Sequence, residues 1–123
     1  MPRVAILDDD QSVLNALARQ LRTAGMEVYT FKSGLELLSG IDHARPDCLL
    51  LDIHMRGING FEVHHRLLRR GIRLPTVVIT AHDDQQIRNH VHDIGARFLA
   101  KPFSAQSLLE NIESVCESDE QRP

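Results

Sequence analysis

The segment Val4-Ala5-Ile6-Leu7-Asp8-Asp9-Asp10 decides the fold, because four apolar residues run directly into three acids. A second segment of the same kind, Cys48-Leu49-Leu50-Leu51-Asp52, follows later in the chain. Strands that are apolar throughout, and do not alternate with polar residues, are typical of a parallel sheet covered on both faces. The two segments therefore predict buried parallel strands, each of which ends at a carboxylate.

The rest of the chain continues this alternation of strand and helix. Apolar runs at 26–31, 76–79 and 98–100 predict three more strands. Apolar residues at helical spacing predict a helix after each strand, the second of them through Leu35, Leu38 and Ile41. Three polar residues are placed to cap helix N-termini, namely Asp10, Asn59 and Ser104. Five strands alternating with five helices predict an α/β domain with a doubly wound, five-stranded parallel sheet, (βα)5.

Length and composition narrow the classes of function. The 123 residues suffice for one domain, which we expect over 1–117, with a polar tail or the start of a linker at 118–123. A net charge of −3 and few aromatic residues argue against nucleic-acid or membrane binding by bulk charge. Cys48 and Cys116 lie in apolar runs and are expected to be buried thiols, not a disulfide. With no targeting or membrane-spanning segment visible, we expect a cytoplasmic protein.

The residues at the ends of the predicted strands have side chains that can bind a ligand or react. Ligands of open α/β sheets bind beyond the carboxyl ends of the strands, which all lie at one edge. Five residues follow or close a predicted strand and should meet there: Asp8, Asp9, Asp52, Thr80 and Lys101. One acid after a strand is commonly only a helix cap, but this joint occurrence at four strand ends favours a site.

Three carboxylates at one edge require a counter-charge. Two of them about 5 Å apart repel by about 3 kcal/mol at an effective dielectric constant of about 20. Carboxylate and carbonyl oxygens suit Mg²⁺, which keeps waters and leaves room for a phosphoryl oxygen. A carboxylate can also attack a phosphoryl donor and form an acyl phosphate. The set therefore indicates phosphoryl transfer with Mg²⁺ as cofactor.

The chain resembles the receiver domain of bacterial two-component response regulators over about residues 3–116. The resemblance rests on Ile6-Leu7-Asp8-Asp9-Asp10, Leu50-Leu51-Asp52-Ile53-His54-Met55, Gly57 to Gly60, Thr80-Ala81, Gly95-Ala96 and Lys101-Pro102-Phe103. It implies a flavodoxin-like strand order, 2-1-3-4-5. The stretch from Thr80 to Asp83, together with Phe98, looks most like receivers joined to LuxR-type DNA-binding domains.

The resemblance implies roles for the strand-end residues. Asp52 is then the phosphoacceptor, and a phosphohistidine of a sensor kinase or phosphotransfer protein is the donor. Asp9, Asp52 and the backbone carbonyl of His54 ligate Mg²⁺, and Asp8 acts through a metal-bound water. Lys101 contacts the phosphoryl group. The domain is then a switch and not a conventional enzyme, although it catalyses its own phosphotransfer and autodephosphorylation.

The signal also follows from the resemblance. Thr80 turns toward the new phosphoryl oxygens, and Phe98, at the switch position, moves inward with it. Phosphorylation adds negative charge and acceptor oxygens, which bias the surface formed by the fourth helix, fifth strand and fifth helix. Phosphorylation-dependent homodimerisation through that surface, and transcriptional control through a C-terminal DNA-binding domain, are hypotheses. The Lys101-Pro102 bond is expected to be cis.

Some residues depart from the family pattern or suggest other functions. Arg56 stands where the family usually has proline. The resemblance also implies that His54 and His82 flank the path of attack at Asp52. The seven histidines contain no i,i+3 or i,i+4 pair that would indicate zinc, and the basic stretch 64–73 is read as a solvated helix face. A haloacid-dehalogenase-type enzyme would need Asp at position 54. The main alternative is a receiver-like interaction module that is never phosphorylated.

Overall fold

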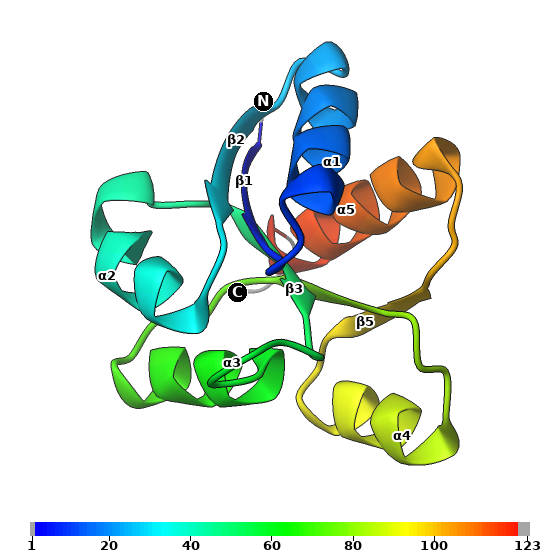
Figure 1. The fold of residues 1–123 in the computed structure, drawn as a ribbon. Coiled ribbons are helices and arrows are strands. Elements are labelled where there is room, and N and C mark those ends of the chain that lie inside the picture. The colour runs from blue at the N-terminus through cyan, green and yellow to red at the C-terminus, as the bar shows by residue number, and fades with distance from the viewer. Residues whose placement is uncertain (1, 121–123) are drawn as a thin grey trace.

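Five strands and five helices alternate along the chain in the computed structural model (Figure 1). The structure describes residues 2–120, and side chains for residues 2–117. The strands are β1 Arg3–Leu7, β2 Glu27–Phe31, β3 Cys48–Asp52, β4 Thr76–Thr80 and β5 Arg97–Ala100. The helices are α1 Gln11–Thr23, α2 Gly34–Ala44, α3 Gly60–Arg69, α4 Gln85–Asp93 and α5 Ala105–Glu120.

The strands form one parallel sheet in the order β2-β1-β3-β4-β5. This confirms the doubly wound, flavodoxin-like (βα)5 fold. The register pairs Leu7 with Leu51, Asp52 with Ile79, and Thr80 with Ala100. The carboxyl ends of β1, β3, β4 and β5 therefore lie level with one another at one edge, where the sequence predicts the site.

Two groups of helices cover the two faces of the sheet (Figure 1). On one face, α1 and α5 pack Leu14, Leu21 and Ile112 against β1, β3 and β4. On the other face, Leu37 of α2 and Val63 of α3 pack with residues of β1 and β3. α4 lies beside them on that face and contributes the buried Val91. Burial on both faces explains why the central strands are apolar throughout.

The helix N-termini confirm the predicted caps. The carboxylate of Asp10 accepts hydrogen bonds from the backbone N–H groups of Ser12 and Val13. The side chains of Asn59 and Ser104 accept from backbone N–H groups three residues ahead. These bonds satisfy N–H groups that have no partner within the helix. Each cap therefore fixes where the chain leaves the sheet edge and enters the next helix.

The helix predicted through Leu35, Leu38 and Ile41 is present, but Leu35 does not lie on its buried face. Leu35 is 62% exposed. The inner stripe of α2 is Leu37, Ile41 and Ala44, which follow helical spacing and are buried. Leu38 is partly buried beside them. Because Leu35 and Leu37 are two residues apart, they lie on opposite sides of the helix, and only one can face the sheet.

Cys48 lies in the sheet and Cys116 in the covering helix α5, and the two do not form a disulfide. Cys48 at the start of β3 is buried as predicted, whereas Cys116 of α5 is only half-buried. The neighbouring Cys116 thiol and burial raise the pKa of Cys48 above its ordinary value. Cys48 therefore stays protonated and packs as a small apolar side chain. Helix α5 continues to Glu120, and residues 121–123 of the expected tail lie outside the described residues.

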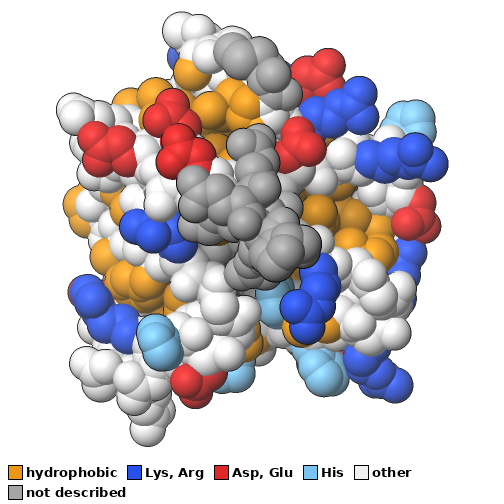
Figure 2. Space-filling model, turned by 180° about the vertical axis from the view of Figure 1, so that it is seen from behind, with side chains coloured by type: hydrophobic (Ala, Val, Ile, Leu, Met, Phe, Trp, Pro, Cys, Tyr) orange, Lys and Arg blue, Asp and Glu red, His pale blue; other side chains and the backbone are white. Residues whose placement is uncertain are grey.

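The surface view in Figure 2 shows one face of the molecule. Lys and Arg side chains are scattered there among Asp and Glu side chains. Several exposed arginines are paired with acids, as in the ion pairs Arg70–Asp42 and Arg66–Glu62 of α3. This arrangement agrees with reading the basic stretch 64–73 as a solvated helix face.

His64 makes stability dependent on pH. Its side chain lies in α3 and is 8% exposed, and burial together with the charges of His90 and His65 lowers its pKa below the ordinary 6.5. The unfolded chain therefore binds a proton that the folded chain does not, so stability falls as pH drops through the unfolded pKa. We expect urea unfolding to show a larger loss between about pH 7.5 and about pH 5.5 in the wild type than in His64→Gln. Equal losses in the two proteins would contradict this role of His64.

Candidate functional site

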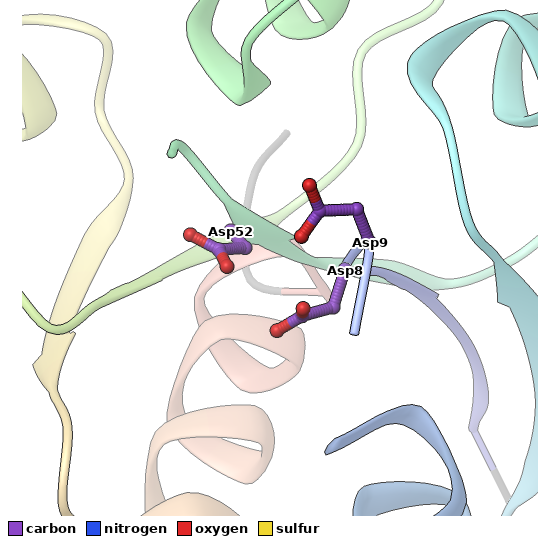
Figure 3. A group of neighbouring side chains, drawn as sticks. All are labelled: Asp8, Asp9 and Asp52. Atoms are coloured by element: carbon purple, nitrogen blue, oxygen red, sulfur yellow. The ribbon is translucent and has the colours of Figure 1, made fainter. Parts of the chain in front are cut away.

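Three carboxylates gather at the carboxyl edge of the sheet (Figure 3). Asp52 is the last residue of β3, and Asp8 and Asp9 directly follow β1. One carboxylate oxygen from each lies within 4.8 Å of those from the other two. Asp8 and Asp52 are buried, whereas Asp9 is exposed. The parallel register of β1 and β3 brings these residues together, as the strand-end pattern predicts.

Lys101 supplies a positive charge to this cluster. It follows β5, and its Nζ donates to Asp8 Oδ2 at 3.0 Å and to Asp52 Oδ2 at 3.4 Å. Its side chain is only 24% exposed, so the two ion pairs are partly shielded from water. The Lys101-Pro102 peptide bond is cis, which confirms that expectation. One ammonium group therefore bridges carboxylates that come from two different strands.

The pKa values of the site reflect this balance of burial and charge. Burial raises the pKa of Asp52, and the negative charge of Asp8 adds to the effect. The N–H of His54 and the ammonium of Lys101 oppose that rise. Burial alone would lower the pKa of Lys101, but its bonds and charge interactions with Asp8 and Asp52 outweigh burial and raise it. Lys101 therefore stays protonated at neutral pH and partly offsets the repulsion among the acids.

Backbone N–H groups hold one oxygen of each carboxylate. His54 donates to Asp52 Oδ1 at 3.0 Å, and Asp10 donates to Asp8 Oδ1 at 2.9 Å. The N–H of Arg56 donates to Asp9 Oδ2 at 3.1 Å. A proline at position 56 has no N–H and could not make this bond. Arg56 therefore positions Asp9 through its main chain, a contact that the sequence pattern did not reveal.

Gly60 is a second residue of the site that sequence reasoning did not single out beyond its loop. It is the first residue of α3, and a Cβ atom there would lie 2.6 Å from the backbone oxygen of Asp52. It would also lie 3.2 Å from the Cα of Ile53. Only glycine lets α3 begin this close to the end of β3. The signal in the sequence is a glycine directly after the predicted cap Asn59.

The cluster meets the chemical requirements of a magnesium site. Its three carboxylates are hard oxygen donors, which Mg²⁺ prefers over nitrogen or sulfur ligands. Because only a few of the ligands of Mg²⁺ come from the protein, coordination positions remain for water and for a phosphoryl oxygen. The acids, with Lys101 beside them, can therefore hold a divalent cation and face an anionic group at the same time.

Comparison with known proteins identifies the family. The model of the response regulator receiver domain matches residues 4–113. This chain belongs to that family. Receiver domains are signalling switches of two-component systems and not conventional enzymes, and they interact with sensor kinases or phosphotransfer proteins. They generally bind Mg²⁺ at an acidic pocket, and Asp8, Asp9 and Asp52 of this receiver form a group that could hold a metal ion.

Individual relatives agree with the assignment. The chain is 37% identical over 114 residues to response regulator MprA of Mycobacterium avium, covering 92% of this chain and 50% of MprA. It is 33% identical over 120 residues to nodulation protein W of Bradyrhizobium diazoefficiens, covering 97% and 53% of the two chains. A response regulator receiver protein from Burkholderia phymatum has a superimposable structure, with a TM-score of 0.80 and 40% identity over 95% of this chain and 96% of that one. The receiver thus spans about half the length of the curated relatives it matches.

Thr80 and Phe98 of this receiver lie outside the carboxylate cluster. Thr80 ends β4 and is fully buried, and its Oγ1 accepts the N–H of His82 at 3.0 Å. Phe98 lies on β5, opposite Val78 of β4, and is partly buried. The imidazoles of His54 and His82 meet edge to face, with ring centroids 4.3 Å apart. The two histidines that follow β3 and β4 are therefore in contact with each other.

No helix among residues 2–120 is both long and apolar enough to cross a bilayer.

Proposed function

We propose that this receiver accepts a phosphoryl group on Asp52 from a phosphohistidine of a sensor kinase or phosphotransfer protein. The observation that supports this most is the position of Lys101, whose Nζ bridges Asp8 and Asp52 in a cluster of three carboxylates. A lone helix-capping acid would not need a half-buried ammonium group beside it. Asp52 has one oxygen held by the N–H of His54 and the other directed to Lys101, which orients the carboxylate for attack.

In the proposed reaction, a carboxylate oxygen of Asp52 forms a bond to phosphorus, and the bond from phosphorus to the donor imidazole nitrogen breaks. The product is an aspartyl phosphate. Lys101 stabilises charge on the phosphoryl oxygens, and Thr80 donates a hydrogen bond to one of them. Asp9, Asp52 and the carbonyl of His54 would hold Mg²⁺, with Asp8 acting through water; the metal would neutralise charge on the phosphoryl group. Water later attacks the same phosphorus, the bond from phosphorus to the Asp52 oxygen breaks and inorganic phosphate leaves, so the domain also dephosphorylates itself.

The output follows from the position of Thr80. When its hydroxyl turns toward the phosphoryl group, Phe98 moves inward, and the surface formed by α4, β5 and α5 changes. We propose that this surface mediates phosphorylation-dependent homodimerisation. Because the curated relatives are about twice as long, we propose transcriptional control through a C-terminal DNA-binding domain. We propose the LuxR type for that domain, because the stretch from Thr80 to Asp83 and Phe98 resemble receivers that are joined to LuxR-type domains. The receiver itself, over 1–117, would not bind nucleic acid. We propose a cytoplasmic location, where a thiol such as that of the buried Cys48 stays reduced.

Magnesium binding separates this function from that of an inert interaction module. We expect Asp9→Asn to bind Mg²⁺ about tenfold more weakly than the wild type in a calorimetric titration, because one anionic ligand is lost. Asp93→Asn removes the same charge from the exposed end of α4 and should bind like the wild type. No binding by the wild type, or equal binding by wild type and Asp9→Asn, would favour the inert module.

A further inference from the structure

The guanidinium group of Arg88 lies over the ring of Phe98. Its Cζ is 4.6 Å from the ring centroid, which is a cation–π contact between α4 and β5. N–H groups of the same guanidinium bind Asp83: Arg88 Nε donates to Oδ1 at 2.5 Å and Nη2 donates to Oδ2 at 2.8 Å. This two-point fork fixes the plane of the guanidinium and therefore where it meets the ring.

The same fork connects Phe98 to Thr80 through a short path. Asp83 belongs to the loop between β4 and α4, one residue after His82. The N–H of His82 donates to Thr80 Oγ1 at 3.0 Å, so this loop is tied to the Thr80 hydroxyl. If Thr80 turns its hydroxyl elsewhere, that bond is lost and the loop bearing Asp83 is released. The hydroxyl, the loop, the guanidinium and the ring thus form one continuous chain of contacts.

The charges of the pair support a persistent contact. The hydrogen bond from Arg88 lowers the pKa of the Asp83 carboxyl, and the bond to Asp83 raises the pKa of Arg88. Both groups are therefore ionised at neutral pH. The side chains of Arg88 and Asp83 are 49% and 44% exposed, so water screens their attraction and the contact stays weak enough to break. A contact of that strength suits an element that must adopt two positions.

We propose that Arg88 is a positioning residue that holds the Phe98 ring in the position seen here and opposes its inward movement. This rests on the proposed function, in which Thr80 and Phe98 move together. In the resting state, Asp83 orients Arg88 and Arg88 retains the ring. On phosphorylation, Thr80 gives up the N–H of His82, the fork loosens, and the ring leaves the guanidinium. Arg88 thus sets how much of the protein is in the active position before any phosphoryl group arrives.

The test uses ring-labelled phenylalanine in the whole chain and follows the NMR signal of Phe98 during titration with beryllofluoride and Mg²⁺, a stable mimic of the phosphoryl group. The signal of Phe98 is assigned from the spectrum of Phe98→Leu. For Arg88→Ala, we expect the ratio of inward to resting ring to rise about three- to tenfold without beryllofluoride. By linkage, the apparent affinity for beryllofluoride should rise by the same factor while the inward state remains a minor one.

Matched variants separate the contact from loss of charge. Arg88→Lys keeps the charge but not the planar fork and should fall between wild type and Arg88→Ala. Asp83→Asn should shift the ring in the same direction by a smaller factor. Arg69→Ala removes an arginine from the exposed end of α3 and should behave as the wild type. Thermal melts show whether each variant is folded.

The outcomes distinguish the two proposals. Failure of the wild type to bind beryllofluoride would overturn the proposed phosphorylation of the receiver and this inference with it. Binding by the wild type, with the ring signal and the affinity of Arg88→Ala both unchanged, would overturn the role of Arg88 alone. A gain in affinity without a change in the ring would also overturn it, because the two must move together.

Discussion

Replacing Lys101 with methionine is expected to slow phosphorylation of Asp52 by acetyl phosphate about a hundredfold. Lys101 is the cation within hydrogen-bond distance of both Asp8 and Asp52, and methionine keeps the length of the side chain without its charge. Its loss removes the ammonium that would face the phosphoryl oxygens as negative charge builds up. The rate is measured from intact mass as a function of time at saturating Mg²⁺.

Two measurements show that the loss is electrostatic and not a loss of metal or fold. Without Lys101 the site is more negative, so Mg²⁺ should bind at least as tightly as in the wild type. Lys101→Arg retains a positive charge and should recover part of the rate. A rate for Lys101→Met within a factor of two or so of the wild type would contradict the role given to Lys101.

Replacing Gly60 with alanine is expected to destabilise the fold by about 2 kcal/mol and to slow phosphorylation as well. The new Cβ would lie 2.6 Å from the backbone oxygen of Asp52, and a backbone atom cannot rotate away as a side chain would. Either α3 or the end of β3 must shift, and the latter carries the phosphoacceptor. Stability is measured by urea unfolding, and phosphorylation by intact mass.

Gly57→Ala is the matched control in the same loop. Gly57 has a φ of +79°, and a Cβ atom there would meet nothing within 4 Å. Its replacement costs about 1 kcal/mol through backbone conformation alone and should leave phosphorylation of Asp52 unchanged. If Gly60→Ala were as stable and as active as the wild type, the close approach of α3 to β3 would not be the reason for glycine at position 60.

The strand-end pattern predicted most of the site because parallel strands make its geometry simple. Once β1, β3 and β5 are known to run in parallel, the residues that follow them must share an edge. Asp8, Asp9, Asp52 and Lys101 therefore come together, although Lys101 lies far from Asp8 in sequence. The helix caps are confirmed for a similar reason, since each depends on local residue types. The strand order, which the resemblance to receiver domains implied, is confirmed as well.

The features that sequence reasoning missed depend on how separate segments pack. The contact of Arg56 N–H with Asp9 joins two loops, and main-chain atoms leave no pattern of residue types. Gly60 is required by the distance between α3 and β3, which no spacing rule gives. Leu35 was misplaced because residues 34–38 contain three leucines, so more than one stripe fits helical spacing. The contact of Arg88 with the Phe98 ring joins α4 to β5, and no pattern of residue types predicts it.

The role of Asp52 as phosphoacceptor can be tested by intact mass. The wild type and Asp52→Asn are incubated in parallel with acetyl phosphate and Mg²⁺, and the intact mass of each protein is measured by mass spectrometry. Asparagine keeps the shape of the side chain but removes its nucleophilic carboxylate. If Asp52 is the phosphoacceptor, the wild type gains one phosphoryl group and Asp52→Asn gains none. A phosphoryl group gained equally by both proteins would contradict it.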